Sequence, residues 1–238
     1  MRFLHPQASL KVVAIALAPL LLLWVGLAET GKESEEKEDP NRVLHESFEE
    51  RPPGKIPSSF FALDGTWSLS EVDGNTALEL AADPLVEAQL QVGESMKETG
   101  GRIRARIKAE RKRRSLPRFG VGLHGASGYR LRIFPAQERL ELVKADEVMQ
   151  SIEIPWNPGE WYFLELSVEP AGGAWTVTGR AWSESEERPE TAQIDYIATD
   201  TRFFGRPSVT GTPFAGLPIW FDDIEIWKTP PEEPEDED

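Results

Sequence analysis

The chain has 238 residues, a formal net charge of −15 at pH 7 and a hydrophobic share of 39%. This length and apolar content suffice for one large domain with a buried core, and they exclude a chain that is disordered throughout. The absence of cysteine excludes disulfides, thiol nucleophiles, thiolate metal sites and a lipidated N-terminal cysteine.

The negative charge is concentrated in two flanking segments. Residues 29–41 hold six acidic and two basic residues, and residues 229–238 hold six acidic residues and no basic one. Such segments repel themselves and stay solvated. We therefore expect residues 29–41 to be a disordered linker and residues 229–238 a disordered, proline-rich tail.

The N-terminal segment has the pattern of an export signal. Arg2 and Lys11 precede an apolar run at residues 12–28, which ends in Gly26-Leu27-Ala28, small residues typical of a cleavage site. The run is near the lower limit for a membrane-spanning helix, so an uncleaved anchor remains an alternative. We predict a signal peptide or signal anchor over residues 1–28, with membrane contact only through residues 12–28, and a periplasmic or extracellular location for the rest.

Residues 42–228 consist of short alternating segments separated by Gly, Pro, Asn and Asp. The predicted strands cover residues 43–50, 66–70, 77–80, 87–92, 102–108, 119–124, 129–133, 139–144, 148–154, 161–168, 175–182 and 219–227. Asp73-Gly74-Asn75 predicts a hairpin turn. For residues 191–212 we expect one strand, near 193–197, and a long loop. Because no helical periodicity occurs after the N-terminal segment, the pattern predicts an all-β, antiparallel sandwich.

The order of these segments resembles the concanavalin A-like lectin and glucanase superfamily, in its laminin-G-like and family 16 glycoside hydrolase-like bacterial members. The matching pieces are Phe48-Glu49, Gly65-Thr66-Trp67-Ser68, Arg104-Ala105-Arg106-Ile107, Tyr129-Arg130-Leu131, Arg139-Leu140-Glu141-Leu142, Gly159-Glu160-Trp161-Tyr162-Phe163-Leu164 and Phe221-Asp222-Asp223-Ile224. The resemblance implies a two-sheet jelly roll over residues 42–228. Its concave face binds glycans in many members, while other members serve as interaction modules.

The sequence lacks the usual catalytic patterns. The hydrolases of this superfamily carry Glu-x-Asp-x-x-Glu on one strand, and Asp222-Asp223-Ile224-Glu225 lacks the third acid. There is no nucleophile elbow, phosphate loop or zinc-ligand spacing. We predict a non-catalytic module that binds a polysaccharide or glycoconjugate, or another component of the cell envelope. The alternatives are a hydrolase or polysaccharide lyase with a noncanonical site, and a structural envelope protein held by an N-terminal anchor.

Nine basic residues lie between Arg102 and Arg118, against the single acid Glu110. Strand alternation places Ile103, Ala105 and Ile107 on one face and the basic residues on the other. Arg130 and Arg132 extend this strip if their strand is a neighbour. Guanidinium groups match carboxylates and sulfates, so these residues predict a site for anionic glycans. The predicted ligand-binding residues are Arg104, Arg106, Lys108, Arg113, Arg130 and Arg132.

The basic run has two other interpretations besides glycan binding. In the first, its side chains pair with acids on neighbouring strands, such as Glu141 and Glu165. In the second, they bind nucleic acid; we do not expect this, because the protein is acidic and exported and the run has no interleaved aromatic residues.

The closing strand suggests a structural calcium site. If Ile224 and Ile226 point into the core, Asp222 points the same way, and a buried carboxylate needs a hydrogen-bond donor or a metal. Calcium takes carboxylate and carbonyl oxygens, and by resemblance its ligands are Glu49 and Asp222, with Asp223 behind them. The alternative is that Asp222 accepts hydrogen bonds from backbone amides at a β-bulge.

Overall fold

The computed structural model describes residues 39–83, 87–97, 99–199 and 204–229. The predicted signal segment at 1–28, most of the linker and nearly all of the tail lie outside these ranges. Within them, no helix combines the length and the apolar character needed to cross a membrane. The predicted membrane segment at 12–28 lies outside the described residues.

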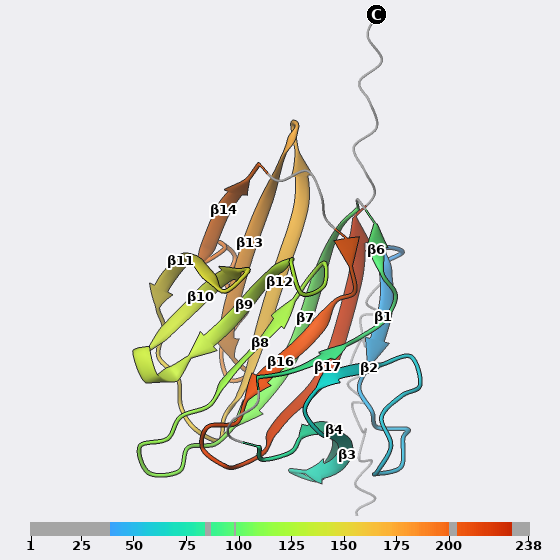
Figure 1. Cartoon of the computed structure of the whole chain (residues 1–238), viewed down its shortest axis with the longest axis vertical. Coiled ribbons are helices and arrows are strands. Elements are labelled where there is room, and N and C mark those ends of the chain that lie inside the picture. The colour runs from blue at the N-terminus through green and yellow to red at the C-terminus, as the bar shows by residue number, and fades with distance from the viewer. Residues whose placement is uncertain (1–38, 84–86, 98, 200–203, 230–238) are drawn as a thin grey trace, which may run out of the picture. The chain divides into compact units, whose positions relative to one another are not determined.

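The described residues form two large antiparallel sheets and one small one (Figure 1). The eight-stranded sheet has the order β14-β13-β12-β7-β17-β4-β3, with β1 also paired to β17. Its strands are β1 Arg42–Glu46, β3 Trp67–Val72, β4 Asn75–Leu80, β7 Gly100–Ala109, β12 Trp161–Ala171, β13 Ala174–Ser183, β14 Ile194–Ala198 and β17 Ile219–Thr229.

The seven-stranded sheet has the order β11-β10-β9-β8-β16-β5-β2. Its strands are β2 Phe61–Asp64, β5 Ala88–Gln91, β8 Arg118–Gly122, β9 Tyr129–Phe134, β10 Arg139–Lys144, β11 Glu147–Glu153 and β16 Ser208–Thr212. Two short strands, β6 Met96–Lys97 and β15 Phe204–Gly205, pair with each other, and η1 Pro135–Gln137 is a single 3₁₀ turn. The predicted all-β antiparallel sandwich is confirmed.

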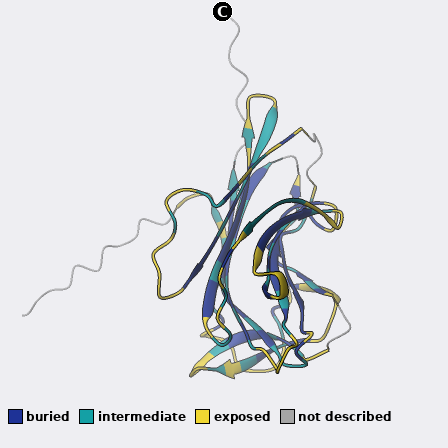
Figure 2. Cartoon of the chain, turned by 90° about the vertical axis from the view of Figure 1, so that its left-hand side faces the viewer, coloured by how far each residue is buried: buried dark blue, intermediate teal, exposed yellow. Residues whose placement is uncertain are grey.

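The core lies between the two large sheets, and Figure 2 shows its buried residues where the sheets face each other. In β7, Ile103, Ala105 and Ile107 are fully buried while the intervening basic residues are partly exposed, as the alternation predicted. In β9, Tyr129, Leu131 and Ile133 are fully buried in the same way. A residue on the inner face of either sheet therefore packs against the other sheet.

The turn predicted between β3 and β4 is confirmed. Val72 pairs with Asn75, so that Asp73 and Gly74 form a two-residue loop. Both have left-handed backbones, with φ of 54° and 89°, which is the conformation of a type I′ hairpin turn. The turn brings Asp73 to the end of the sheet, where its carboxylate accepts hydrogen bonds from Lys108.

Two strands of the seven-stranded sheet, β2 and β16, were not predicted from the sequence. All four residues of β2 are exposed, so no buried face produces an alternating pattern. In β16, Ser-Val-Thr-Gly-Thr, all five residues are buried although only Val209 is a large apolar residue. The expected long loop at 191–212 was wrong in this part, because β16 lies between β8 and β5 and is covered through pairing with both.

We predict that Gly179→Ala destabilises the sandwich by about 1–3 kcal/mol, the usual cost of overpacking a core. Gly179 of β13 faces the opposite sheet, and an added Cβ lies 2.6 Å from Leu131 Cδ1 of β9. Leu131→Val shortens that side chain, so the double variant loses less stability than the sum of the two single variants. Urea unfolding of all four proteins measures this coupling, and additive losses would contradict the contact between the sheets.

Candidate functional site

The basic strip, here Arg102, Arg104, Arg106 and Lys108 of β7, lies on the outer face of the eight-stranded sheet. Its side chains are paired with acids from neighbouring elements. Arg104 donates to Glu225, Arg106 donates to Asp222 and Glu184, and Lys108 donates to Asp73. The pairing interpretation of the basic run is confirmed for these residues, and each acid neutralises part of the strip.

Aromatic side chains complete this outer face. The guanidinium of Arg102 lies 3.9 Å from the ring centre of Trp227, and that of Arg106 lies 4.6 Å from the ring centre of Trp161. Such cation–π contacts add to the ion pairs and help to fix the positions of the guanidinium groups. Asp222 and Glu225 are at most 5% exposed here. The cost of burying them is partly offset by Arg106 for Asp222 and by Arg104 and Arg42 for Glu225.

Arg130 and Arg132 do not extend the strip. They lie on β9 in the seven-stranded sheet, whereas the strip lies on β7 in the other sheet. Since the two inner faces meet at the core, the outer faces point in opposite directions. Arg130 pairs with Asp146 and Glu87, and Arg132 donates to Glu141. The condition for one continuous basic strip, that the two strands be neighbours, is not met, because alternation assigns a residue to a face but not to a sheet.

Arg113 occupies a separate position, at the tip of a tight turn between β7 and β8. Lys112 and Ser115 exchange two backbone hydrogen bonds, of 3.2 and 3.1 Å, which enclose Arg113 and Arg114. Arg113 has a left-handed backbone with φ of 59°, a conformation that costs a non-glycine residue about 1 kcal/mol or more. Its side chain is exposed.

The closing strand contains a β-bulge that changes the direction of Asp222. The register between β17 and β7 shifts between Asp222 and Glu225, and Asp223 has a left-handed backbone with φ of 44°. Ile224 and Ile226 face the core as expected. Asp222, however, points to the outer face and contacts Arg106; the expectation that it points inward was wrong, because the bulge inserts one extra residue and reverses the alternation.

The residues predicted to bind calcium are engaged in other ways. One oxygen of Asp222 accepts from Arg106 and the other accepts from the backbone N–H of Asp223 at 2.8 Å, as the bulge alternative predicted. Glu49 is exposed in the turn after β1. No group of three or more His, Asp or Glu side chains within the described ranges has a geometry that could hold a metal ion. This arrangement gives no support to calcium binding by Glu49, Asp222 and Asp223, which stays an untested prediction.

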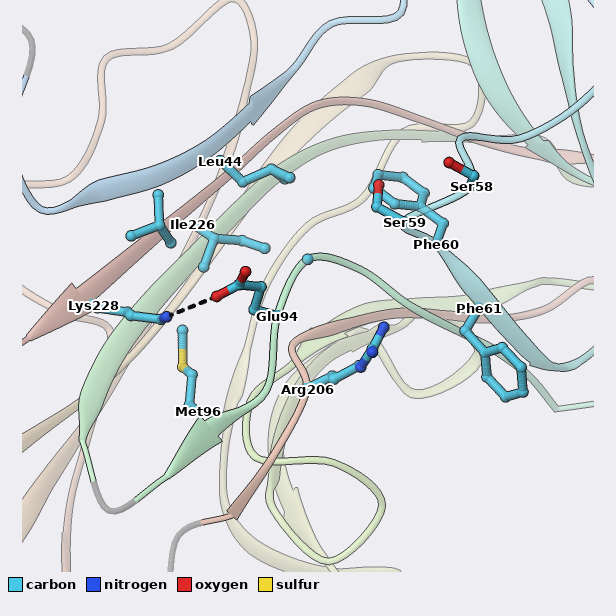
Figure 3. A pocket seen from close by; sticks show the side chains of 12 residues that line it. Leu44, Ser58, Ser59, Phe60, Phe61, Glu94, Met96, Arg206, Ile226 and Lys228 are labelled. Carbon is cyan, nitrogen blue, oxygen red and sulfur yellow. Dashed lines mark hydrogen bonds and ion pairs between the residues drawn. The ribbon is translucent and has the colours of Figure 1, made fainter.

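A pocket of about 410 Å³ lies where the edges of the two large sheets approach each other (Figure 3). It is formed by residues far apart in the sequence, none of which was predicted to belong to a site. They are Val43, Leu44, Ser58, Ser59, Phe60, Phe61, Gly93, Glu94, Met96, Arg206, Ile226 and Lys228. Its size falls within the range of about 300–1,000 Å³ typical of small-molecule sites.

The pocket combines an apolar floor with a polar rim. Leu44, Met96 and Ile226 contribute apolar side chains, and Phe61 is 58% exposed at one side. Glu94 and Lys228 form an ion pair at 3.4 Å across from Phe61 (Figure 3). From the sequence alone, only the aromatic pair Phe60-Phe61 and Arg206 could have indicated this pocket. Both lie in segments without the alternation of apolar and polar residues that marks a strand.

No family model matches the sequence, and no curated protein matches it. Solved structures with a similar fold do exist. The carbohydrate recognition domain of Emp47p has a TM-score of 0.52 at 7% identity, covering 78% of this chain and 95% of that one. The exoplasmic domain of VIP36, in a form bound to Ca²⁺ and Man3GlcNAc, has a TM-score of 0.51 at 9% identity, covering 75% and 87%. Lectin II from Ulex europaeus has a TM-score of 0.50 at 8% identity, covering 79% and 100%.

At these identities the similarity concerns the fold alone. The described residues form a concanavalin A-like β-sandwich, and the resemblance seen in the sequence is confirmed at the level of the fold.

We predict that Asp222 makes stability depend on pH in the opposite direction from an ordinary surface carboxylate. Burial, reinforced by the charge of Asp223, raises the pKa of Asp222 from 3.8 to about 6, although Arg106 opposes this shift. The folded state therefore holds a proton that the unfolded state has lost between about pH 4 and 6, and the free energy of unfolding falls as pH rises through that range. The full shift corresponds to about 3 kcal/mol at most.

Asp222→Asn removes this titration and serves as the reference. The difference in unfolding free energy, wild type minus variant, is expected to fall between pH 4 and pH 7 in urea titrations. A difference that rises with pH would instead show that the ion pair with Arg106 dominates over burial.

Proposed function

We propose that this chain is a non-catalytic carbohydrate-binding module and that a saccharide binds in the pocket beside Phe61. The observation that carries the proposal is the exposed ring of Phe61 on a pocket rimmed by hydroxyl and charged groups. Support for the ligand class comes from the fold, which this chain shares with domains described as a carbohydrate recognition domain and a lectin.

The lining residues suit the two kinds of surface that a sugar presents. The C–H face of a pyranose ring packs on an aromatic ring, a role that Phe61 can fill because its side chain is exposed rather than part of the core. Sugar hydroxyls need donors and acceptors. Ser58 and Ser59 supply both, Lys228 and Arg206 supply donors, and Glu94 supplies an acceptor.

The charged groups of this pocket favour binding over hydrolysis. Glycoside hydrolysis commonly uses two carboxyl groups on either side of the scissile bond. The lining residues of the pocket include one carboxylate, Glu94, and it pairs with Lys228. The acids Asp222, Asp223 and Glu225 lie on the outer face, where Arg104 and Arg106 contact them.

The proposal includes a preference for anionic glycans and export by residues 1–28 to the periplasm or the extracellular space. Arg104, Arg106, Lys108, Arg130 and Arg132 pair with acids of the same chain, so an anionic ligand would have to compete with these acids. Among the residues predicted from the sequence, this leaves the exposed turn at Arg113 as the more accessible cation. Fractionation of the native host tests export, and it separates a soluble form from one anchored through residues 12–28.

We predict that Phe61→Ala weakens saccharide binding by about 5- to 30-fold, because an aromatic stacking contact contributes on the order of 1–2 kcal/mol. A glycan array identifies the saccharide, and isothermal titration calorimetry compares the two proteins. Phe214→Ala is the matched control, since Phe214 is 40% exposed and stacks on Arg118, away from the lining residues of the pocket. Equal losses in both variants, or unchanged binding in Phe61→Ala, would contradict this site.

A further inference from the structure

Arg206 at the rim of the pocket differs from most arginines on the two sheets. Arg42, Arg104, Arg106, Arg130, Arg132, Arg180 and Arg188 all form ion pairs with acids of the chain. Within the described ranges, the half-buried side chain of Arg206 forms no hydrogen bond or ion pair. Partial burial without a partner has a desolvation cost, which a bound anion would offset.

The backbone holds Arg206 in a fixed position. Its carbonyl oxygen accepts a hydrogen bond of 3.0 Å from the N–H of Gly125, and the carbonyl of the next residue, Pro207, accepts one of 2.9 Å from Val92. Gly205 has φ of +135° and lies so close to His124 and Gly125 that a Cβ would be 2.7 Å from their backbone atoms. The guanidinium is thus presented from a fixed backbone, which reduces the entropy lost on binding.

The charges of the pocket leave one cation uncompensated. Its charged lining residues are Glu94, Arg206 and Lys228. Glu94 and Lys228 pair with each other, so Arg206 gives the pocket a net positive charge within a chain of net charge −15. Figure 3 shows Arg206 between that ion pair and the ring of Phe61. A ligand stacked on Phe61 therefore has a guanidinium beside it.

We propose that Arg206 makes the pocket selective for saccharides that carry a carboxylate on the ring, the uronates. The inference rests on the proposed function, because it assumes that a saccharide occupies this pocket. A guanidinium donates two parallel N–H bonds to the two oxygens of a carboxylate, and this charge-assisted pair is among the stronger polar contacts. Phe61 supports the ring, the serine hydroxyls bind its hydroxyl groups, and Arg206 recognises the carboxylate.

The test compares ligands that differ only at the carboxyl group. Oligogalacturonate and its fully methyl-esterified form share one sugar backbone, and a sulfated galacto-oligosaccharide carries an anion of another geometry. The full chain is expected to bind oligogalacturonate at least tenfold more tightly than either of the others. Equal binding of the sulfated ligand would overturn carboxylate selectivity.

Variants assign the selectivity to one residue. Arg206→Gln is expected to weaken oligogalacturonate binding about 10- to 100-fold, the loss of one bidentate charged contact, and to leave the esterified ligand within about twofold. Arg206→Lys keeps the charge without the planar fork, so it recovers only part of the affinity. Arg139→Gln is the charge-matched control, because Arg139 is exposed on β10 and is absent from the pocket lining.

The outcomes separate this inference from the proposed function. If saccharides bind, Phe61→Ala weakens them, and Arg206→Gln keeps the ratio between the acidic and esterified ligands, the pocket stands and the role of Arg206 is overturned. If no saccharide binds the wild-type chain, the proposed function is overturned and the inference with it.

Discussion

The backbone pairing of β17 is the constraint on which the rest of the structure depends. This strand is the last of the domain. It pairs with β7 along one edge and with β4 and β1 along the other, so the first and last strands lie side by side. Phe221, Ile224 and Ile226 of β17 are buried in the core. The bulge at Asp222 and Asp223 keeps these apolar residues inside while it turns two carboxylates outward.

The outward carboxylates explain what the basic run does. Asp222 and Glu225 are almost fully buried on the outer face, and charges in such places persist in folded proteins only when they are paired. Arg104 and Arg106 supply that pairing, with the rings of Trp161 and Trp227 beside the strip. The bases of β7 thus pair with acids on the same outer face, and removing Arg106 would leave Asp222 buried without its cation.

The pocket arises from a different feature, the meeting of two sheet edges. Edge strands leave space that a closed core does not, and here β1, β17, the start of β2, β6 with the connection before it, and Arg206 after β15 surround it. Of its two cations, Arg206 is half-buried and is not paired with Glu94, and the ring of Phe61 is exposed. Phe61 and Arg206 are therefore available to a ligand, because neither is needed to fill the core or to form the ion pairs of the outer face.

The sequence by itself determined the all-β class, most strand positions, the Asp73-Gly74 turn and the assignment of Ile103, Ala105 and Ile107 to the core, because period-two burial and turn chemistry are local. It left β2 and β16 undetected, since neither has an alternating apolar face. Only the tertiary structure decided that Arg104 and Arg130 belong to opposite faces, that Asp222 meets Arg106, and that Phe61 and Arg206 share a pocket. Strand order, register shifts and the approach of sheet edges are contacts between distant residues, and alternation within one strand carries no information about them.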